Sequence, residues 1–364
     1  MRIAVLHHGN DFSNDYAAYL SGLLDETAAA NDFVVKDYHY LRLTKDPLPA
    51  ASLLMHIVIP AESNFALTYW YNVKLPAIFK KYGIDKVISL FGICAATPIP
   101  QLLVLPDTGL LKPHKKMPVW QNYAAKKLGK SIATAKGCIT YSNHAKETYG
   151  KVYAAAQNAT VVPYTVNEIF TPKEWHDKLY IKSRFAENKE YFVALIPGSN
   201  VEQFTDILKA FSRFKKWQQS NMQLLLMPKE ETFTRAIDDK LDSYKFREDV
   251  KLLYEPERKE TAEIIATAYA MMHMATTDAD LLPIAAAIQC GTPVIAYYTP
   301  SIQEYCGAAA KLIPEPGFEP LGDELIQVFK NETLKAAMCD AAVNRAANYT
   351  QNHIATALWH QLKS

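Results

Sequence analysis

Polar residues follow several of the predicted strands, at positions where a ligand could be held. Asp107 and Asp278 each come shortly after an apolar run, and Lys229 follows a third run. Carboxylates accept hydrogen bonds, and an ammonium group attracts negative charge. Pro283 stands at the start of a predicted helix. Because ligands of parallel sheets bind at the carboxyl ends of the strands, we expect Asp107, Asp278 and Pro283 to line one cleft.

Each of these residues also has a purely structural interpretation, and both interpretations stay open. Asp278 could cap the helix that begins near Pro283, and Asp107 could cap a loop. Lys229 could be an ordinary exposed lysine. Glu304, which follows the last predicted strand, is expected to pair locally.

The composition excludes several other chemistries. The five cysteines form no Cys-x-x-Cys pair and the ten histidines no His-Glu-x-x-His pattern, so neither a zinc site nor a disulfide framework is expected. Lys and Arg number 39 against 38 Asp and Glu, so no global charge attracts nucleic acid or acidic lipid. The lysines from Lys112 to Lys116 and from Lys126 to Lys130 are interpreted as solvated faces.

No membrane span or secretion signal is expected either. No apolar run approaches the roughly 18 residues that a membrane span needs. The first residues, Met1 to His8, are too short an apolar stretch and become polar too soon for a signal peptide. With unpaired cysteines, this predicts a cytoplasmic location.

Hydrophobic periodicity predicts alternating strands and helices in the first half of the chain. The helices have apolar residues on one face, as at Tyr16, Leu20 and Leu23. Ser142 is placed to cap a helix with its hydroxyl group. The predicted strands are 2–6, 86–90, 101–105, 137–141 and 160–162, and the predicted helices are 15–28, 73–82, 115–135 and 146–156.

The alternation restarts after residues 167–189, a polar stretch that we interpret as an interdomain linker. Gly291, followed by Thr292 and Pro293, is typical of a helix stop before a strand. Alternation of this kind predicts an α/β chain with two parallel, doubly wound sheets. The predicted strands of the second half are 191–196, 223–227, 251–253, 271–275 and 293–297, and its helices are 203–216, 261–270 and 283–289.

Six short motifs occur in an order and spacing that is similar to one protein family. They are LPAIFKK at 75–81 with Asp85, PQLLVLPD at 100–107, CITYS at 138–142, VVPY at 161–164 with Phe170, DILKAF at 206–211, and LP at 282–283 with CGTPVI at 290–295, Glu304 and Gly307. No single motif is specific, but their order and spacing together are. Over nearly its whole length the chain resembles the family 4 (group 1) glycosyltransferases.

The resemblance implies a GT-B fold, in which two Rossmann-like domains face each other across a cleft. The implied domains are 1–167 on the acceptor side, 168–344 on the nucleotide-sugar side, and a helix at 345–364 that returns to the first domain. It implies metal-independent hexosyl transfer from a UDP- or GDP-sugar, with retention, to a glycan or lipid-linked acceptor. It implies no further cofactor, no nucleic acid partner, and at most peripheral contact with a membrane.

Matched motif by motif, the resemblance also assigns residues to the site. It places Asp107 and Asp278 in the catalytic centre. The residues that it places at the donor are Gly9, Lys229, Leu282, Pro283 and Glu304.

The charged groups that such a site uses are largely replaced in this chain. The family's Arg-Lys pair, which meets the diphosphate, falls on Val201 and Glu202. The glutamate that holds the ribose falls on Ala286, its partner glutamate is the shorter Asp278, and the family's histidine is Pro106. Preorganised positive groups stabilise a leaving diphosphate. Their replacement predicts weak donor binding.

Three functional interpretations follow. The chain is a sugar-nucleotide-dependent transferase with a rearranged site, in which Asp107, Asp278 and Lys229 hold the donor. Alternatively, it is a catalytically silent pseudo-glycosyltransferase that binds or guides a partner glycosyltransferase. A third interpretation is a doubly wound enzyme of another class, such as a sugar-phosphate epimerase.

Overall fold

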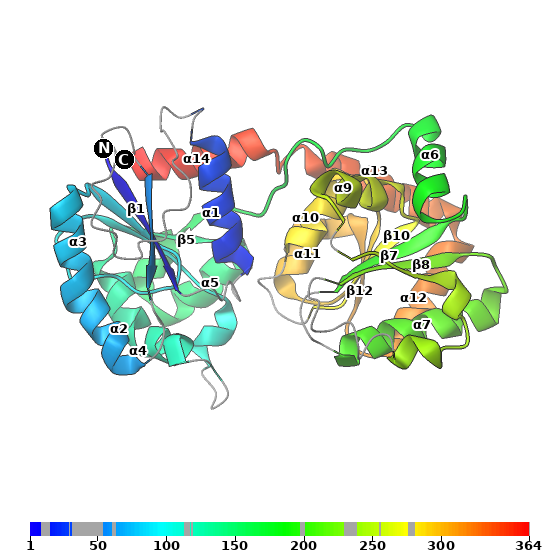
Figure 1. Ribbon diagram of the computed structural model, residues 1–364, viewed down its shortest axis with the longest axis horizontal. Helices are drawn as coiled ribbons and strands as arrows, with labels where there is room; N and C mark the ends of the chain where they lie inside the picture. The colour runs from blue at the N-terminus through cyan, green and yellow to red at the C-terminus, as the bar shows by residue number, and fades with distance from the viewer. Residues whose placement is uncertain are drawn as a thin grey trace. The chain divides into compact units, whose positions relative to one another are not determined.

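The structure is a computed structural model that describes residues 1–8, 15–28, 30, 54–59, 63–112, 117, 119–196, 201–228, 239–254, 256–275 and 281–363. The chain forms two compact units. The first contains Met1–Tyr164 and Asn352–Ser364, and the second contains Thr165–Thr276 and Leu281–Gln351. Each unit is an α/β body with one parallel sheet (Figure 1).

The first unit has a six-stranded parallel sheet in the order β2-β1-β3-β4-β5-β6. Its strands are β1 (Ile3–His8), β2 (Leu54–Ile59), β3 (Lys86–Ser89), β4 (Gln101–Val104), β5 (Gly137–Thr140) and β6 (Thr160–Val161). Strand β1 is central, because Ile3 is registered with both Leu54 and Lys86. Residues Ile3 to Leu6 of β1 and Leu102 to Val104 of β4 are buried apolar runs, as strands covered on both faces require.

The helices of the first unit connect these strands. They are α1 (Asp15–Thr27), α2 (Asn64–Tyr69), the π-helix η2 (Trp70–Lys74), α3 (Leu75–Tyr82), the 3₁₀-helix η3 (Thr108–Leu111), α4 (Val119–Thr134), α5 (Asn143–Val152), the 3₁₀-helix η4 (Ala154–Asn158) and α14 (Gln351–Lys363). Ser142 caps α5 as predicted, since its Oγ accepts a hydrogen bond from the Ala145 N–H at 3.0 Å.

Helix α14 packs on the first unit although it ends the chain (Figure 1). Trp359 is 1% exposed, and its indole Nε1 donates to Thr27 Oγ1 at 2.8 Å, next to the end of α1. Lys86 Nζ donates to the Leu362 carbonyl at 2.8 Å. The end of the chain therefore contributes buried side chains to the first core.

The second unit has a sheet of the same size, in the order β12-β11-β10-β7-β8-β9. Its strands are β7 (Tyr191–Ile196), β8 (Gln223–Pro228), β9 (Val250–Leu252), β10 (Ala270–His273), β11 (Val294–Tyr297) and β12 (Ala310–Ile313). Its helices are α6 (Trp175–Phe185), α7 (Val201–Gln218), η6 (Arg247–Asp249), α9 (Arg258–Thr267), α10 (Leu282–Gln289), α11 (Pro300–Cys306), η7 (Gly307–Ala309), α12 (Phe318–Lys330) and α13 (Glu332–Ala346).

Helices α7 and α12 pack closely on this sheet. A Cβ atom at Gly322 of α12 would lie 3.1 Å from the Ala210 carbonyl of α7, so glycine permits the approach. Beneath them, Phe192 meets Phe214 edge-on at a centroid distance of 5.2 Å. Both phenylalanines are fully buried.

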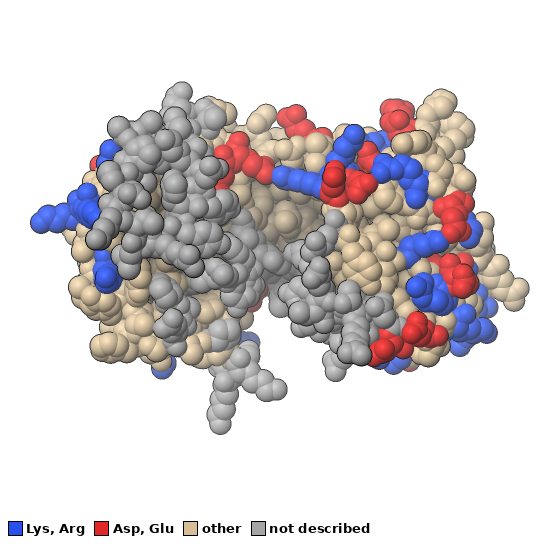
Figure 2. Space-filling model, viewed as in Figure 1, with Lys and Arg blue, Asp and Glu red and all other residues tan. Residues whose placement is uncertain are grey.

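The interpretation of residues 167–189 as a linker is wrong, because helix α6 occupies about half of this stretch and the whole stretch belongs to the second unit. Ile181 of α6 is 3% exposed, and Arg184 pairs with Glu260 at 2.8 Å and with Glu263 at 3.1 Å. The mixed charges that suggested a linker thus hold α6 against α9. On the face shown in Figure 2, described acidic and basic side chains lie interspersed over the second unit.

Candidate functional site

The strand order of the second sheet reverses between β7 and β10. Strands β8 and β9 follow on one side, and β11 and β12 on the other. In open parallel sheets ligands bind at such a switch point, outside the carboxyl ends of the strands. Helix α7 begins there at Val201, after β7 ends at Ile196, and helix α10 begins at Leu282, after β10 ends at His273. The starts of α7 and α10 therefore mark the candidate donor site.

At the carboxyl-end edge of the second sheet, the first turn of helix α10 presents backbone groups and no charged side chain. Leu282 is half-buried, Pro283 is buried in the first turn, and no acidic residue lies in that turn. Leu281 precedes the helix and makes no side-chain capping bond. Ala286 is 5% exposed and lies among other buried apolar residues of the helix. The helix provides its dipole and free N–H groups, but no carboxylate for a ribose.

The predicted helix stop after α10 is confirmed. Gly291 has φ of +68°, a left-handed conformation that favours glycine, and its N–H bonds to the Ile288 carbonyl. Thr292 Oγ1 donates to the Ile265 carbonyl at 2.7 Å. These bonds fix the entry into β11, which leads to the next loop of the same edge.

The loop after β11 turns directly into helix α11. Thr299 caps the helix, since its Oγ1 accepts from the Ile302 N–H at 3.1 Å. Glu304 lies in this helix and is partly buried. Arg345 Nε donates to the Tyr305 carbonyl at 2.5 Å, and its Nη2 donates to the Glu304 carbonyl. The guanidinium thus lies at the C-terminal end of α11, where a cation complements the helix dipole.

In the first unit, Asp107 caps the turn that follows β4. Its Oδ1 accepts from the Gly109 N–H at 2.7 Å and starts the 3₁₀-helix η3. Tyr149 OH donates to the carbonyls of Pro106 and Asp107, both at 3.1 Å. Burial, with the Asp107 charge adding to it, raises the pKa of Tyr149 well above its ordinary value, so this hydroxyl stays protonated. The loop-cap interpretation of Asp107 is confirmed.

Several of the expected site residues lie outside the described residues. These are Gly9, Lys229 and Asp278, and the side chains of Val201 and Glu202. The structure brings Leu282, Pro283 and Glu304 together on the α10–β11–α11 segment of the second unit, while Asp107 belongs to the first unit. That Asp107, Asp278 and Pro283 line one cleft stays a prediction.

Sequence reasoning missed Tyr149 and Arg345, which hold two of these loops. Tyr149 is 42 residues from Asp107, and Arg345 is 41 residues from Glu304. Local patterns carry no signal for such pairs. Thr299 was within reach, because a threonine followed by proline is typical of a helix start.

The described residues offer neither a cluster of metal ligands nor a membrane-spanning helix. Among the described residues, no group of three or more His, Cys, Asp or Glu side chains could hold a metal ion. Within the same part of the chain, every helix is too short or too polar to cross a bilayer.

Comparison with known proteins gives matches in structure only. No family model matches the chain, and no curated protein sequence does. WaaG, a glycosyltransferase involved in lipopolysaccharide biosynthesis, has a TM-score of 0.71 at 15% identity over 98% of each chain. Anabaena HepE in complex with UDP and glucose has a TM-score of 0.73 at 12% identity over 100% of each chain.

The sucrose-phosphate synthase of Thermosynechococcus elongatus is a third match. It has a TM-score of 0.71 at 15% identity and covers 100% of this chain and 98% of its own. Agreement over the full length of all three proteins, with two six-stranded parallel sheets, identifies the fold and confirms the predicted class. The chain has the GT-B fold of these glycosyltransferases, built from two Rossmann-like, doubly wound units.

Proposed function

We propose that this chain is a glycosyltransferase-like protein that retains the frame of a nucleotide-sugar site and has lost the transfer chemistry. In this proposal it acts as a binding or partner protein, for example beside an active glycosyltransferase. UDP- and GDP-sugars would then be bound weakly and not turned over.

The observation that carries the proposal is the apolar character of α10. The helix begins at the switch point of the second sheet, where a donor would bind. From Pro283 to Ile288 every side chain is buried and apolar, and the ribose position is Ala286. On the other side of the switch point, α7 starts with Val201 and Glu202 in place of an Arg-Lys pair. Neither helix start carries the groups that the chemistry needs.

The size of the expected loss follows from ordinary magnitudes. A hydrogen bond to a charged group contributes about 1.5–3 kcal/mol, and about 1.4 kcal/mol changes affinity tenfold. Loss of the Arg-Lys pair and of the ribose carboxylate removes at least two such bonds. A nucleotide that an intact site binds at micromolar levels would be bound here at roughly millimolar levels or worse.

A second candidate is an active transferase with a rearranged site. Two observations favour it: Asp107 stands at the carboxyl end of β4 in a well-defined turn, and HepE, a protein of the same fold, is solved with UDP-glucose. In this candidate Asp107, Asp278 and Lys229 hold the donor, and transfer is metal-independent and retains configuration. The acceptor would be a glycan or a lipid-linked sugar.

The experiment that separates the candidates measures hydrolysis and transfer of UDP- and GDP-sugars. We expect no turnover by the unaltered protein, and improved nucleotide binding by a variant with Val201→Arg and Glu202→Lys. The matched control is Val343→Arg with Asp340→Lys, which makes the same charge change on exposed positions of α13. Turnover by the unaltered protein would establish the second candidate. Equal binding by both double variants would contradict the proposed location of the site.

Ala286→Glu is a third, more demanding change. Because Ala286 is 5% exposed, a glutamate there has to displace neighbours. Its thermal melting temperature should therefore be compared with that of the unaltered protein before its binding is interpreted. The Val201→Arg, Glu202→Lys variant tests the proposal without this complication.

A further inference from the structure

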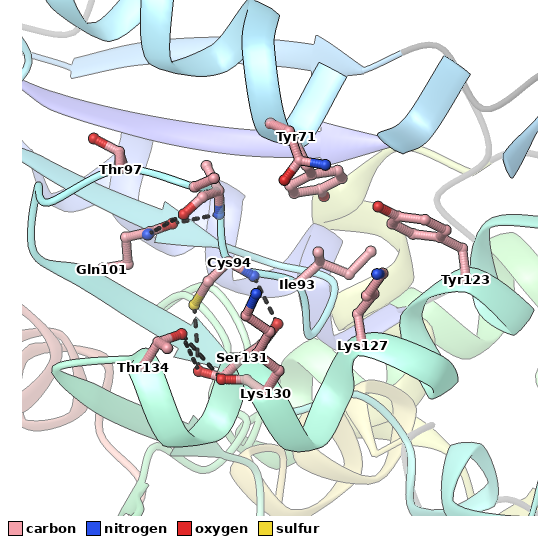
Figure 3. A pocket seen from close by; sticks show the side chains of 13 residues that line it. Tyr71, Ile93, Cys94, Thr97, Gln101, Tyr123, Lys127, Lys130, Ser131 and Thr134 are labelled. Carbon is pink, nitrogen blue, oxygen red and sulfur yellow. Dashed lines mark hydrogen bonds between the residues drawn. The ribbon is translucent and has the colours of Figure 1, made fainter. Parts of the chain in front are cut away.

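The first unit contains a pocket that lies apart from the ligand edge of its sheet. We call it the α4 pocket and define it by six of its lining residues: Tyr71, Cys94, Gln101, Tyr123, Lys127 and Lys130. Its volume is about 180 Å³. Gln101 opens β4, whereas Asp107 follows the carboxyl end of the same strand. The α4 pocket thus includes the amino end of β4, and its lining side chains are drawn in Figure 3.

One wall of the pocket is a loop that three different elements hold in place. The Cys94 N–H donates to Ser131 Oγ of α4 at 3.0 Å. The Gln101 side chain bonds both the N–H and the carbonyl of Ala95, each at 2.8 Å. The Ala96 N–H donates to the Tyr71 carbonyl at 2.9 Å. A wall fixed in this way is formed before any ligand arrives, which lowers the entropic cost of binding.

A second part of the wall comes from the π-helix η2. Wider turns of this kind are rare and occur frequently at functional sites. Here the π-helix places the 2%-exposed Tyr71 in the pocket. Burial raises the pKa of Tyr71 well above its ordinary value, and it raises the pKa of Cys94 to about 12. Both side chains stay neutral, so the buried part of the pocket carries no negative charge and no reactive thiolate.

The charge of the pocket comes from one face of α4. Tyr123, Lys127, Lys130, Ser131 and Thr134 follow a helical spacing and all line the pocket. Lys127 Nζ lies 5.7 Å from the centre of the Tyr123 ring. Both lysines are exposed at the rim, and the residues that line the pocket, all within the described ranges, include no carboxylate. The lysine run interpreted from sequence as a solvated face therefore contributes two lysines to the lining of one pocket.

We propose that the α4 pocket binds a small phosphate-bearing anion. The ammonium groups of Lys127 and Lys130 would hold the phosphate oxygens, and the hydroxyl groups of Ser131 and Thr97 lie among the other lining groups. A cavity of about 150 Å³ accepts a six-membered ring, so this pocket suits inorganic phosphate or a small phosphate monoester. Phosphate on a lipid headgroup presents the same chemistry at the rim.

The test is calorimetric titration of the full chain with inorganic phosphate and with glycerol 3-phosphate, at low ionic strength because exposed charges are screened by salt. Lys127→Ala and Lys130→Ala should each weaken binding about tenfold, the effect of losing one such contact. Lys126→Ala is the matched control, because this exposed lysine of the same helix does not line the pocket and should leave binding unchanged. Ala96→Leu, which enlarges a lining side chain without changing charge, should also weaken binding.

Two results would overturn the proposal: no measurable phosphate binding, or equal losses in Lys126→Ala and Lys130→Ala. Co-sedimentation with phosphatidylcholine vesicles containing phosphatidic acid distinguishes the source of the phosphate. If the protein binds the vesicles, and Lys130→Ala loses both vesicle binding and binding of the soluble anions, the natural ligand is a lipid headgroup. If the protein binds the soluble anions but not the vesicles, the natural ligand is a free metabolite. Lys127 and Lys130 belong to the first unit, so a loss of binding in their variants does not depend on the proposed donor site of the second unit.

Discussion

Three buried cysteine thiols have pKa values that burial raises above the ordinary value. Burial raises the pKa of Cys290 and Cys306 from the ordinary 9.0 to about 12, and that of Cys138 to about 11. The folded protein therefore keeps these protons while the unfolded chain begins to lose them near pH 9. Since the folded state binds more protons above that pH, the free energy of unfolding falls as pH rises from about 9 towards 12.

We predict that urea denaturation gives a lower free energy of unfolding at about pH 10 than at about pH 8. Below pH 9 these thiols contribute no pH dependence. Cys306→Ala removes one of the titrating groups. The decrease in its free energy of unfolding from about pH 8 to about pH 10 should therefore be smaller than in the unaltered protein, even if the variant is less stable at about pH 8. An equal free energy of unfolding at about pH 8 and about pH 10 in the unaltered protein would contradict the raised pKa values of these thiols.

At the residue scale, capping roles were predictable and long-range contacts were not. Ser142 and Asp107 cap their own neighbours within three residues, so their local sequence contains the signal. Gln101 was assigned only as the start of a strand, although its amide holds the loop at Ala95. The assignment of Val201 and Ala286 to the donor site depends on motif spacing alone, and it stays a prediction.

Helix ends are the element-scale feature with the clearest energetic consequences. Gly307 ends α11 with φ of +55° and ψ of −126°, a conformation that L side chains rarely adopt. A Cβ atom there would also lie 3.2 Å from Arg345 Nη1. By contrast, Gly22 lies inside α1 and a Cβ atom there would meet nothing within 4 Å.

We therefore predict opposite effects of the same substitution. Gly307→Ala should destabilise the protein by about 1–3 kcal/mol because of backbone strain. Gly22→Ala should stabilise it by about 0.5–1 kcal/mol, since alanine loses less backbone entropy in a helix. Thermal or urea denaturation checks both, and a stable Gly307→Ala variant would show that the end of α11 adapts freely.

Long periodic elements were predictable, and short or charged ones were not. Helix α7 and strand β7 have strong apolar patterns and were assigned within a few residues. Strand β12 is only four residues long and mostly half-buried, so its alternation is weak. Helix α6 has few buried residues, and its ion pairs with α9 involve partners more than 70 residues away. Such elements depend on tertiary contacts that a single sequence does not display.

At the scale of the whole molecule, the alternation of strands and helices was enough to predict two doubly wound units. The family resemblance implied a helix at 345–364 that returns to the first domain, but the sequence did not indicate which contact Trp359 makes there. Trp359 is fully enclosed and bonded to Thr27, 332 residues away in the chain. We infer that the first unit needs its C-terminal helix for stability.

We predict that Trp359→Ala destabilises the first unit by about 3–5 kcal/mol, the usual cost of truncating a buried aromatic side chain. Amide hydrogen exchange should become faster in α1 and stay unchanged in α7. Trp175→Ala is the matched control, because Trp175 is 66% exposed on α6. Equal acceleration in both units, or none in α1, would contradict the role of α14.

The most direct test of the central claim is calorimetric titration of the unaltered protein with UDP and with GDP. The account predicts little or no heat at micromolar nucleotide, with dissociation constants of about a millimolar or weaker, and recovery of binding when Val201→Arg and Glu202→Lys are introduced together. Micromolar binding by the unaltered protein would contradict the account. It would mean that other groups hold the nucleotide and that the chain is a transferase with a rearranged site. Lys229→Ala would then be the first variant to measure.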